Sequence, residues 1–459
     1  MNPFYNPIFL SKILKSYLFD INRLRRLDDQ QLQRFQDKKF KKIVEFAYTV
    51  PLYYEKYKKA GVHPRDISEL KDIEKVPFIT KQDIKKYYPD GIISKNKRKD
   101  QLVEVSTSGT TGKSLSIFVD MFDVVMGLFG YLRTIREYDL NWRKSKLTII
   151  GDFASHTAES GYINKGLQPR ISSNFVFKNI QWLDTNADPK ENLEKINGFK
   201  PDFIGGYVGM LGHMALLKEQ GFGKDVTPKV IAATGSVLDK SLRDYIEQSF
   251  QAKLYEVYGA TETGPIAFEC KDGGYHVMSD LLHLEFFNNN EPVTSGDAGK
   301  LVVTKLFGRG TPIIRYDAIN DIVAPTDKKC TCGLSGDLIE KIYGRTDLSL
   351  TLPDGKVLMP SVFAEIYSKI LHQLKSTKLK DTKIIQKDLH TIEIQVVIDK
   401  KQKKGPSEKE IMSLIREGFE KKVGPDVSIV VQEVEKLGDH EARIVSKIKR
   451  NSTEVTGYL

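Results

Sequence analysis

The sequence predicts an α/β protein in which a large unit built on a parallel-rich sheet precedes a small α+β unit. The first observation is an alternation of short β-type runs with helical patterns between residues 100 and 345. Such alternation is typical of crossover helices that connect parallel strands. If it forms such a sheet, binding residues should collect where the strands end. The β-type runs that carry this prediction are 146–151, 203–206, 230–233 and 254–258, and apolar residues at helical spacing occupy 239–250 between the last two.

The second observation is a mainly helical pattern over residues 1–100. Its first apolar stripe, with Lys12 and Lys15 lying off it, fits either a helix docked on its own protein or a helix at a membrane surface, and we favour the docked helix. Further on, Thr80 is expected to cap a helix, with Asp83 at the partner position of a capping box. The stripe consists of Leu10, Ile13, Leu14, Tyr17 and Leu18.

The third observation is a change of pattern after Asp347. Residues 382–398 predict a strand pair, Ser407 and Glu410 have capping-box spacing before a helix that reaches about Lys422, and 427–434 predict another strand. About 110 residues can fold around a core of their own. We therefore divide the chain into a large N-terminal unit of residues 1–346, with its helical part at 1–100, and a small α+β unit of residues 347–459.

Size and composition limit the function. A chain of 459 residues is too long for one core, and 40% hydrophobic with 28% charged residues is typical of globular proteins. We expect a cytoplasmic protein without a transmembrane segment, because no apolar run is long enough to span a membrane, no signal-peptide pattern is present and cysteine is rare. The net charge of +10 comes from widely spread lysines without a nucleic-acid-binding motif, so we expect no nucleic acid partner. The oligomeric state is not predicted.

Residues 105–114 combine six hydroxyl side chains, two glycines and Lys113 between two apolar runs, 102–105 and 115–119. Glycines let the backbone approach an anion closely, so the pattern indicates a phosphate-binding loop. It is not a Walker A loop, because Thr107 stands where that motif needs glycine. An ordinary hairpin turn is the alternative.

A second group lies at 254–264, where a β-like run ends in Tyr258, Gly259 and Glu262. Such a strand end can stack a base on the tyrosine and hold a divalent cation with the carboxylate. Taken alone, this pattern is more often structural than functional.

The three cysteines form a third group with one histidine. Cys270 and His276 are six residues apart, and Cys330 and Cys332 follow in a Cys-x-Cys pair. Three thiolates and an imidazole fit a structural tetrahedral Zn²⁺ site, which we favour over unrelated buried cysteines with a surface histidine.

Taken in order, four motifs resemble those of the adenylate-forming superfamily of acyl-CoA synthetases. The branch that is most similar contains the phenylacetate–CoA ligases and capsular-polysaccharide biosynthesis proteins, which 76–81 and 354–360 also resemble. The resemblance covers nearly the whole chain and implies a large adenylation domain with a small mobile C-terminal domain. The four motifs are the loop at 107–113, Tyr-Gly-Ala-Thr-Glu at 258–262, the segment 311–321 and Gly-Arg-Thr-Asp at 344–347.

The resemblance implies a role for each matching residue. Thr261 and Glu262 would face the α-phosphate and Mg²⁺, Arg345 would lie beside the ribose, and Asp347 would be the hinge. Asp321 would bind the ribose hydroxyls, with Asp317 as the weaker candidate. Tyr207, with 153–162, would line the acid pocket. The ATP phosphates would be held by Thr107, Ser108, Gly109, Thr110, Thr111, Gly112 and Lys113, and adenine by Thr234, Gly235, Ser236, Tyr258 and Gly259.

The implied activity is ATP-dependent conversion of a carboxylic acid to an acyl-adenylate, followed by transfer to CoA. An amine acceptor and a non-catalytic member serving capsule biosynthesis are the alternatives. The superfamily usually has a catalytic lysine near the C-terminus, often after glycine, whereas Gly438 is not followed directly by one. Lys447 or Lys449 is the expected substitute, and Lys113 is the next cation to test. The sequence does not identify the acid.

Overall fold

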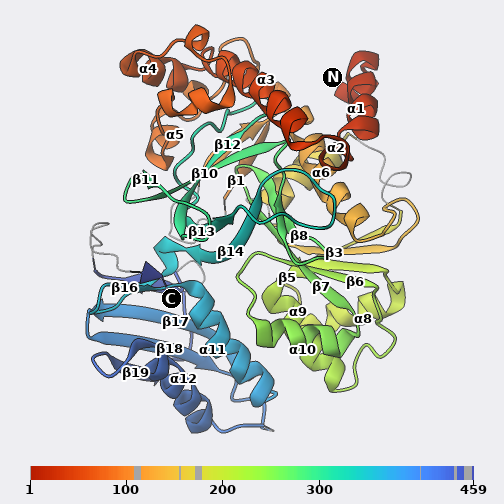
Figure 1. Cartoon of the computed structure of the whole chain (residues 1–459). Helices are drawn as coiled ribbons and strands as arrows, with labels where there is room; N and C mark the ends of the chain where they lie inside the picture. Colours follow the sequence, from red (N-terminus) through yellow and green to blue (C-terminus); the bar gives the residue numbers. More distant parts are fainter. Residues whose placement is uncertain are drawn as a thin grey trace.

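The structure is a computed structural model that describes residues 2–107, 115–154, 157–170, 178–403, 405–438, 442–448 and 457–458. The N-terminal helices lie at one end, a large sheet with its helices occupies the middle, and the C-terminal part lies at the other end (Figure 1). No helix in these ranges combines the length and the apolarity needed to cross a membrane.

Helices form most of the first 100 residues, as predicted. The predicted cap at Thr80 is confirmed: its side chain accepts from the Asp83 N–H, and the Asp83 carboxylate accepts from the Thr80 N–H. The longest helix of this part packs Phe40, Ile43 and Val44 into the main core. The helices are α1 (Pro7–Phe19), α2 (Arg23–Arg26), α3 (Asp29–Ala47), α4 (Pro51–Ala60) and α5 (Lys81–Tyr87).

Helix α1 docks on the protein with one edge of its predicted stripe only. Ile13 and Tyr17 pack against the main core, where the Tyr17 ring meets Phe129 at a centroid distance of 5.8 Å. The other members of the stripe stay exposed, Leu14 by 58% and Leu18 by 56%. The docked helix that we favoured is confirmed, and its docked face is displaced around the helix toward Ser16.

The central sheet has twelve strands in the order β11-β10-β12-β13-β14-β9-β8-β7-β6-β5-β3-β4. Pairing is parallel from β4 to β7 and antiparallel from β7 to β11. The sequence predicts four of the parallel strands, β3, β5, β6 and β7, but not β4. The sheet is therefore mixed, and its antiparallel part is made of hairpins that the alternation of strands and helices does not reveal. The parallel strands are β3 (Leu147–Gly151), β4 (Ile180–Asp184), β5 (Phe203–Tyr207), β6 (Val230–Thr234) and β7 (Lys253–Ala260). The antiparallel ones are β8 (Gly264–Glu269), β9 (Tyr275–Val277), β10 (Leu282–Asn288), β11 (Glu291–Pro292), β12 (Gly299–Lys305), β13 (Asp321–Thr326) and β14 (Leu338–Arg345).

Helices connect the parallel strands and build a second core against them. Ile196, Leu211 and Ile246 are fully buried in it, each on a different helix. Helix α6 (Met121–Glu137) and the π-helical segment Ser160–Leu167 belong instead to the main core and its surface. The connecting helices are α8 (Pro189–Phe199), α9 (Val208–Glu219) and α10 (Lys240–Phe250).

A separate antiparallel hairpin, β1 (Val103–Ser106) and β2 (Ser116–Val119), confirms the two strands predicted around the hydroxyl-rich loop. Thr107 closes the hairpin, because its N–H donates to the Leu115 carbonyl at 2.9 Å and its Oγ1 accepts from the Leu115 N–H at 2.9 Å. Residues 108–114, which include Ser108, Gly109, Thr110, Thr111, Gly112 and Lys113, lie outside the described part of the chain.

The C-terminal part has its own core, which includes Ile394, Ile415 and Phe419. The predicted strand pair, the Ser407 capping box and the last predicted strand are confirmed. Helix α11 (Pro360–Gln373) lies beside α10 and α9 (Figure 1). The other elements are β15 (Leu350–Thr351), β16 (Lys356–Leu358), β17 (Leu379–Asp388), β18 (Thr391–Ile398), α12 (Glu408–Val423), β19 (Ser428–Glu433), β20 (Ile444–Ser446) and β21 (Gly457–Tyr458).

Candidate active site and candidate metal centre

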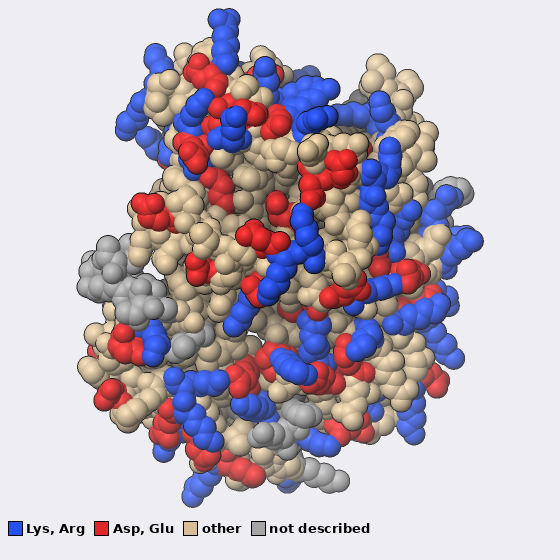
Figure 2. Space-filling view, in the orientation of Figure 1, with Lys and Arg blue, Asp and Glu red and all other residues tan. Residues whose placement is uncertain are grey.

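A cleft of about 890 Å³ lies between the ends of the parallel strands and helices α11 and α12. Basic and acidic side chains are interspersed over the face of the molecule that Figure 2 shows. The cleft gathers every described residue that the sequence assigns to ATP, with the exception of Lys447. These residues are Thr107, Thr234, Gly235, Ser236, Tyr258, Gly259, Thr261, Glu262, Asp321 and Arg345.

The end of β6 forms one wall of the cleft. Gly235 has φ of +85°, and a Cβ atom there would lie 2.2 Å from the ring of Tyr207. Only glycine satisfies both the left-handed backbone and this contact. The contact fixes the Tyr207 ring at the end of β5, where it lines the same cleft.

Tyr258 and Asp321 face each other across the cleft from β7 and β13. The Tyr258 hydroxyl donates to Asp321 Oδ2, and Asp321 is only 7% exposed. Burial raises the pKa of Asp321 to about 6, although the hydroxyl and the nearby Arg345 favour the ionised form. Asp317, the weaker candidate, pairs with Lys300 at 2.5 Å and does not line the cleft.

Glu262 is 8% exposed behind the Tyr258 motif. Its Oε1 accepts from the Tyr316 hydroxyl at 3.2 Å. Burial raises its pKa, whereas the Tyr316 hydrogen bond and the positive charges of Arg345 and Lys81 oppose that rise. Arg345 also holds Asp347 through two hydrogen bonds of 3.0 Å each. The cleft therefore presents carboxylates and cations side by side.

Arg315 has a structural position. It is 6% exposed, pairs with Glu285 at 2.8 Å and donates to the Val76 carbonyl at 2.9 Å. The Ile79 N–H donates to the Arg315 carbonyl at 2.9 Å, which joins the N-terminal helical part to the sheet.

This junction carries Lys81, the first residue of α5, to the cleft. Our sequence reasoning assigned Lys81 no functional role. The only available signal was its place in the segment 76–81, because the contact joins residues more than 230 positions apart.

Lys447 lies outside the cleft. Its backbone N–H donates to the Gln386 carbonyl at 3.0 Å and its side chain is exposed. Lys449 lies outside the described residues. The cation that the C-terminal part brings to the cleft is instead Lys422 of α12, which pairs with Glu365 at 2.7 Å.

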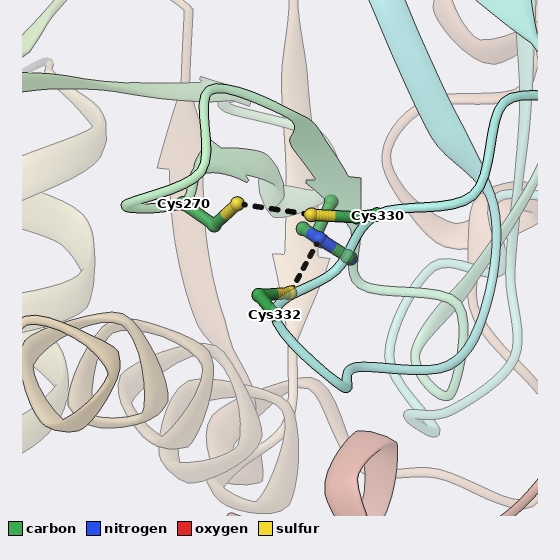
Figure 3. Close-up of side chains that lie close together, drawn as sticks. Cys270, Cys330 and Cys332 are labelled. Atoms are coloured by element: carbon green, nitrogen blue, oxygen red, sulfur yellow. Dashed lines mark hydrogen bonds between the residues drawn. The ribbon is translucent and has the colours of Figure 1, made fainter.

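The four predicted metal ligands come together, and their ligand atoms all lie within 4.8 Å of one another. Cys270 follows β8, His276 lies on β9, and Cys330 and Cys332 come from the loop before β14 (Figure 3). The Sγ atoms of Cys270 and Cys330 are 3.5 Å apart, and Cys332 Sγ lies 3.1 Å from His276 Nε2. The cysteines are free thiols.

These residues fit a tetrahedral metal ion. Ligands about 2.0–2.3 Å from a Zn²⁺ ion lie about 3.3–3.8 Å from one another, close to the two separations observed. Burial lowers the pKa of His276 to about 4, so its imidazole is neutral and able to ligate. Its Nδ1 is buried and has no hydrogen-bond partner among the described residues.

Comparison with known proteins agrees with this architecture. No family model matches the chain. Phenylacetate-coenzyme A ligase of Thermus thermophilus is 25% identical, over 71% of this chain and 72% of that protein. The protein of the same name from Aromatoleum evansii is 25% identical, over 86% of this chain and 88% of that one. Protein CapK of Staphylococcus aureus is 24% identical, over 72% of each.

Among solved structures, 2-hydroxyisobutyryl-CoA ligase in complex with R3-HIB-AMP superposes with a TM-score of 0.70 at 16% identity, over 93% of this chain and 90% of that one. The fold is thus that of an adenylate-forming enzyme. In sequence, the chain is similar to the phenylacetate-coenzyme A ligases and to CapK.

Proposed function

We propose that the protein activates a carboxylic acid with ATP, forms an acyl-adenylate and transfers the acyl group to CoA. The observation that carries this proposal is the cleft itself, which collects Tyr258 and Glu262, Asp321, and Arg345 from three separate segments of the chain. Tyr258 would stack against adenine, and Asp321 would accept both ribose hydroxyls.

The chemistry requires stabilisation of charge rather than a side-chain nucleophile. The substrate carboxylate attacks the α-phosphate, and negative charge grows on the phosphoryl oxygens and on the departing pyrophosphate. Arg345 and Lys81 supply positive charge on the side of Glu262. Glu262 would hold Mg²⁺, which supplies Lewis-acid stabilisation of this charge when it is bound. The hydroxyl-rich loop Thr107–Lys113 would grip the phosphates.

CoA is the acceptor that the relatives support best, because several are named phenylacetate-coenzyme A ligases. An amine acceptor is the second candidate. The similarity to CapK supports a third candidate, a non-catalytic member that serves capsule biosynthesis. The exposed position of Lys447 favours this third reading if no domain movement occurs.

We further propose that residues 347–459 form the small mobile domain and that Asp347 is its hinge. The separate core of this part and the short contact of α11 with α9 and α10 support the division. For Lys447 to reach the α-phosphate, this domain would have to rotate, and Lys422 would then leave the cleft. The geometry of this structure would then correspond to a step other than adenylation.

The Cys270–His276–Cys330–Cys332 cluster would hold a structural Zn²⁺ ion. The ion would tie the turn after β8 to the loop before β14, the strand that ends at Arg345. It would thus stabilise one side of the nucleotide cleft without taking part in the reaction. The three free thiols also support a cytoplasmic location.

ATP–pyrophosphate exchange over a panel of aryl, aliphatic and hydroxylated acids tests the first half-reaction. Exchange with at least one acid, followed by thioester formation when CoA is added, is the expected result. Hydroxylamine can replace CoA as a general acceptor to detect the acyl-adenylate if CoA fails. No exchange with any acid from a protein that binds ATP would refute the enzymatic proposal.

A further inference from the structure

Beyond Tyr207, which lines the cleft, lies a carboxylate that the proposed reaction does not use. This carboxylate belongs to Glu159, which immediately precedes the π-helical segment Ser160–Leu167. The Tyr207 hydroxyl donates a hydrogen bond to Glu159 Oε1. Because the Tyr207 ring lines the cleft and packs on Gly235, Glu159 lies directly beyond the nucleotide site.

The π-helical segment connects this carboxylate to the reaction centre. Tyr162, less than one turn after Glu159, donates from its hydroxyl to the Thr261 carbonyl at 3.2 Å. On the other side, Gly161 packs so closely on β1 that a Cβ atom would lie 3.1 Å from Val105 Cγ2. One short element thus touches the strand before the hydroxyl-rich loop, the Thr261–Glu262 motif and, through Glu159, the cleft residue Tyr207.

The surroundings of Glu159 are polar and carry negative charge. Burial, followed by the charges of Glu159 and Asp152, raises the pKa of Tyr207. In the described part of the chain, no lysine or arginine lies within ion-pair distance of the Glu159 or Asp152 carboxylate. Asp152 Oδ1 accepts from two neutral donors, the Ala154 N–H at 3.1 Å and Asn186 Nδ2 at 3.2 Å.

Aromatic side chains are also close to Glu159. The Phe153 ring meets Trp182 edge to face at 5.8 Å, and a Cβ atom on Gly151 would contact both Phe153 and the stem of Glu159. Burial, and then the charge of Glu159, raises the pKa of Tyr131 on α6, so this tyrosine is near the same carboxylate.

We propose that Glu159 selects the substrate, and that the acid carries a hydrogen-bond donor, either a hydroxyl or an ammonium group, on its acyl part. This inference rests on the proposed function. With the substrate carboxylate beside Thr261 and Glu262, the acyl part would extend past Tyr207 toward Glu159. A purely apolar acyl group would displace water from a carboxylate to which the described residues offer no cation, which is costly. A donor on the acyl group replaces that water, and a site built for such a donor rejects the analogue that lacks it.

The test is equilibrium binding, measured by calorimetry on the full-length protein saturated with AMP. The probes are two matched pairs of acids, phenylacetate with 4-hydroxyphenylacetate and hexanoate with 6-aminohexanoate. In at least one pair, the donor-bearing acid should bind at least about tenfold more tightly, as expected for a hydrogen bond to a charged group. The first pair reports a hydroxyl preference and the second an ammonium preference.

Three variants separate recognition from structure. Glu159→Leu should abolish the preference. Glu159→Gln keeps the acceptor for the Tyr207 hydroxyl but not the charge, so it should keep a hydroxyl preference and lose an ammonium preference. Glu191→Gln is the matched control, because its carboxylate is 58% exposed on α8 and pairs with Lys195 along the helix. AMP affinity and thermal unfolding check that each variant folds. If Glu159→Leu does not fold, the test relies on Glu159→Gln.

The inference is overturned if the wild type binds no acid, if it binds both apolar acids as tightly as their donor-bearing partners, or if the preference survives Glu159→Leu. Pyrophosphate exchange tests the proposed function independently of acid binding. Exchange with apolar acids alone would leave that function standing and remove the role of Glu159. A preference for the donor-bearing acid in binding, without pyrophosphate exchange, would keep the role of Glu159 and refute the proposed function.

Discussion

Replacing Asp321 by asparagine should make the protein more stable and a poorer nucleotide binder. Burial raises the pKa of Asp321 from 3.8 to about 6. At about 1.36 kcal/mol per tenfold change in proton affinity, that difference corresponds to about 3 kcal/mol. Above pH 6 the folded protein bears this cost, since it must keep a buried carboxylate ionised. Asparagine has the same shape, still accepts the Tyr258 hydrogen bond and carries no charge.

The sign of the pH dependence follows from proton binding. Between about pH 4 and pH 6 the folded protein holds a proton at Asp321 that the unfolded chain has released, so the stability contributed by this group falls as the pH rises through that window. Asp321→Asn should therefore gain up to about 3 kcal/mol at pH 8 and nothing near pH 4. If residues 1–346 unfold as one unit, with an unfolding entropy of about 2.1 cal/mol/K per residue, the Tm of Asp321→Asn should be about 4 °C higher than that of the wild type at pH 8.

Nucleotide binding should change in the opposite direction. Hydrogen bonds to a charged group contribute about 1.5–3 kcal/mol each, so losing two to the ribose hydroxyls should weaken AMP binding at least about 100-fold. In the wild type, AMP affinity should also fall as the pH drops below about 6, where Asp321 becomes protonated.

Thermal unfolding at pH 8 and pH 4, together with calorimetric titration of AMP, measures both effects. Asp317→Asn is the matched control, since that carboxylate pairs with Lys300 outside the cleft and should leave AMP affinity unchanged. Wild-type AMP affinity in Asp321→Asn would exclude the ribose role. An unchanged Tm at pH 8 would show that burial does not raise the pKa of Asp321 as described.

Four further predictions concern the cations and metals. Glu262→Gln should lower pyrophosphate exchange at least about 100-fold with the fold intact, and an unchanged rate would remove Glu262 from the Mg²⁺ role. Lys81→Ala should lower kcat/KM for ATP about tenfold. The control is Lys240→Ala, which removes an exposed cleft lysine paired with Asp244 at 2.6 Å and should leave kcat/KM unchanged. Equal effects of the two substitutions would mean that Lys81 acts only through general charge. Lys447→Ala should impair exchange and spare thioester formation from preformed acyl-adenylate, and normal exchange would redirect the test to Lys449 and Lys113. Elemental analysis should find about one zinc per chain, and a metal-free protein with undiminished Tm would refute the structural zinc site.

The sequence predicts the parts of this protein whose signals are local. The strand runs, the Thr80 and Ser407 caps and the strand pair after Asp347 all depend on neighbours within a few residues, and the structure confirms them. The hydrophobic stripe of α1 shows the limit of such signals. Periodicity identifies the apolar face, but the surface against which the helix docks decides which edge of that face is buried.

Long-range contacts are what the local pattern misses. Lys81 reaches the cleft because Ile79 pairs with Arg315 and Tyr316, and Glu159 matters because its π-helical turn meets Tyr207. Neither pairing leaves a periodic or spaced signal in the chain. The choice between Asp317 and Asp321 is of the same kind, since only the three-dimensional structure puts one against Tyr258 and the other against Lys300.

The balance of charge in the cleft explains why the described residues alone do not complete a site for ATP. Glu262, Asp321 and Asp347 surround Arg345, and burial raises the pKa of the first two, so the cleft resists full ionisation of its own carboxylates. ATP would add several more negative charges at the same place. The five cations among the described cleft residues, Lys81, Lys240, Lys341, Arg345 and Lys422, face six carboxylates and cannot offset this added charge. We therefore assign the remainder to Mg²⁺ at Glu262, to the loop ending in Lys113 and to a lysine that the C-terminal part would deliver. If that assignment is correct, the affinity for AMP should depend little on Mg²⁺, whereas the affinity for ATP should depend on it strongly. Equal Mg²⁺ dependence for the two nucleotides, measured by calorimetry, would refute it.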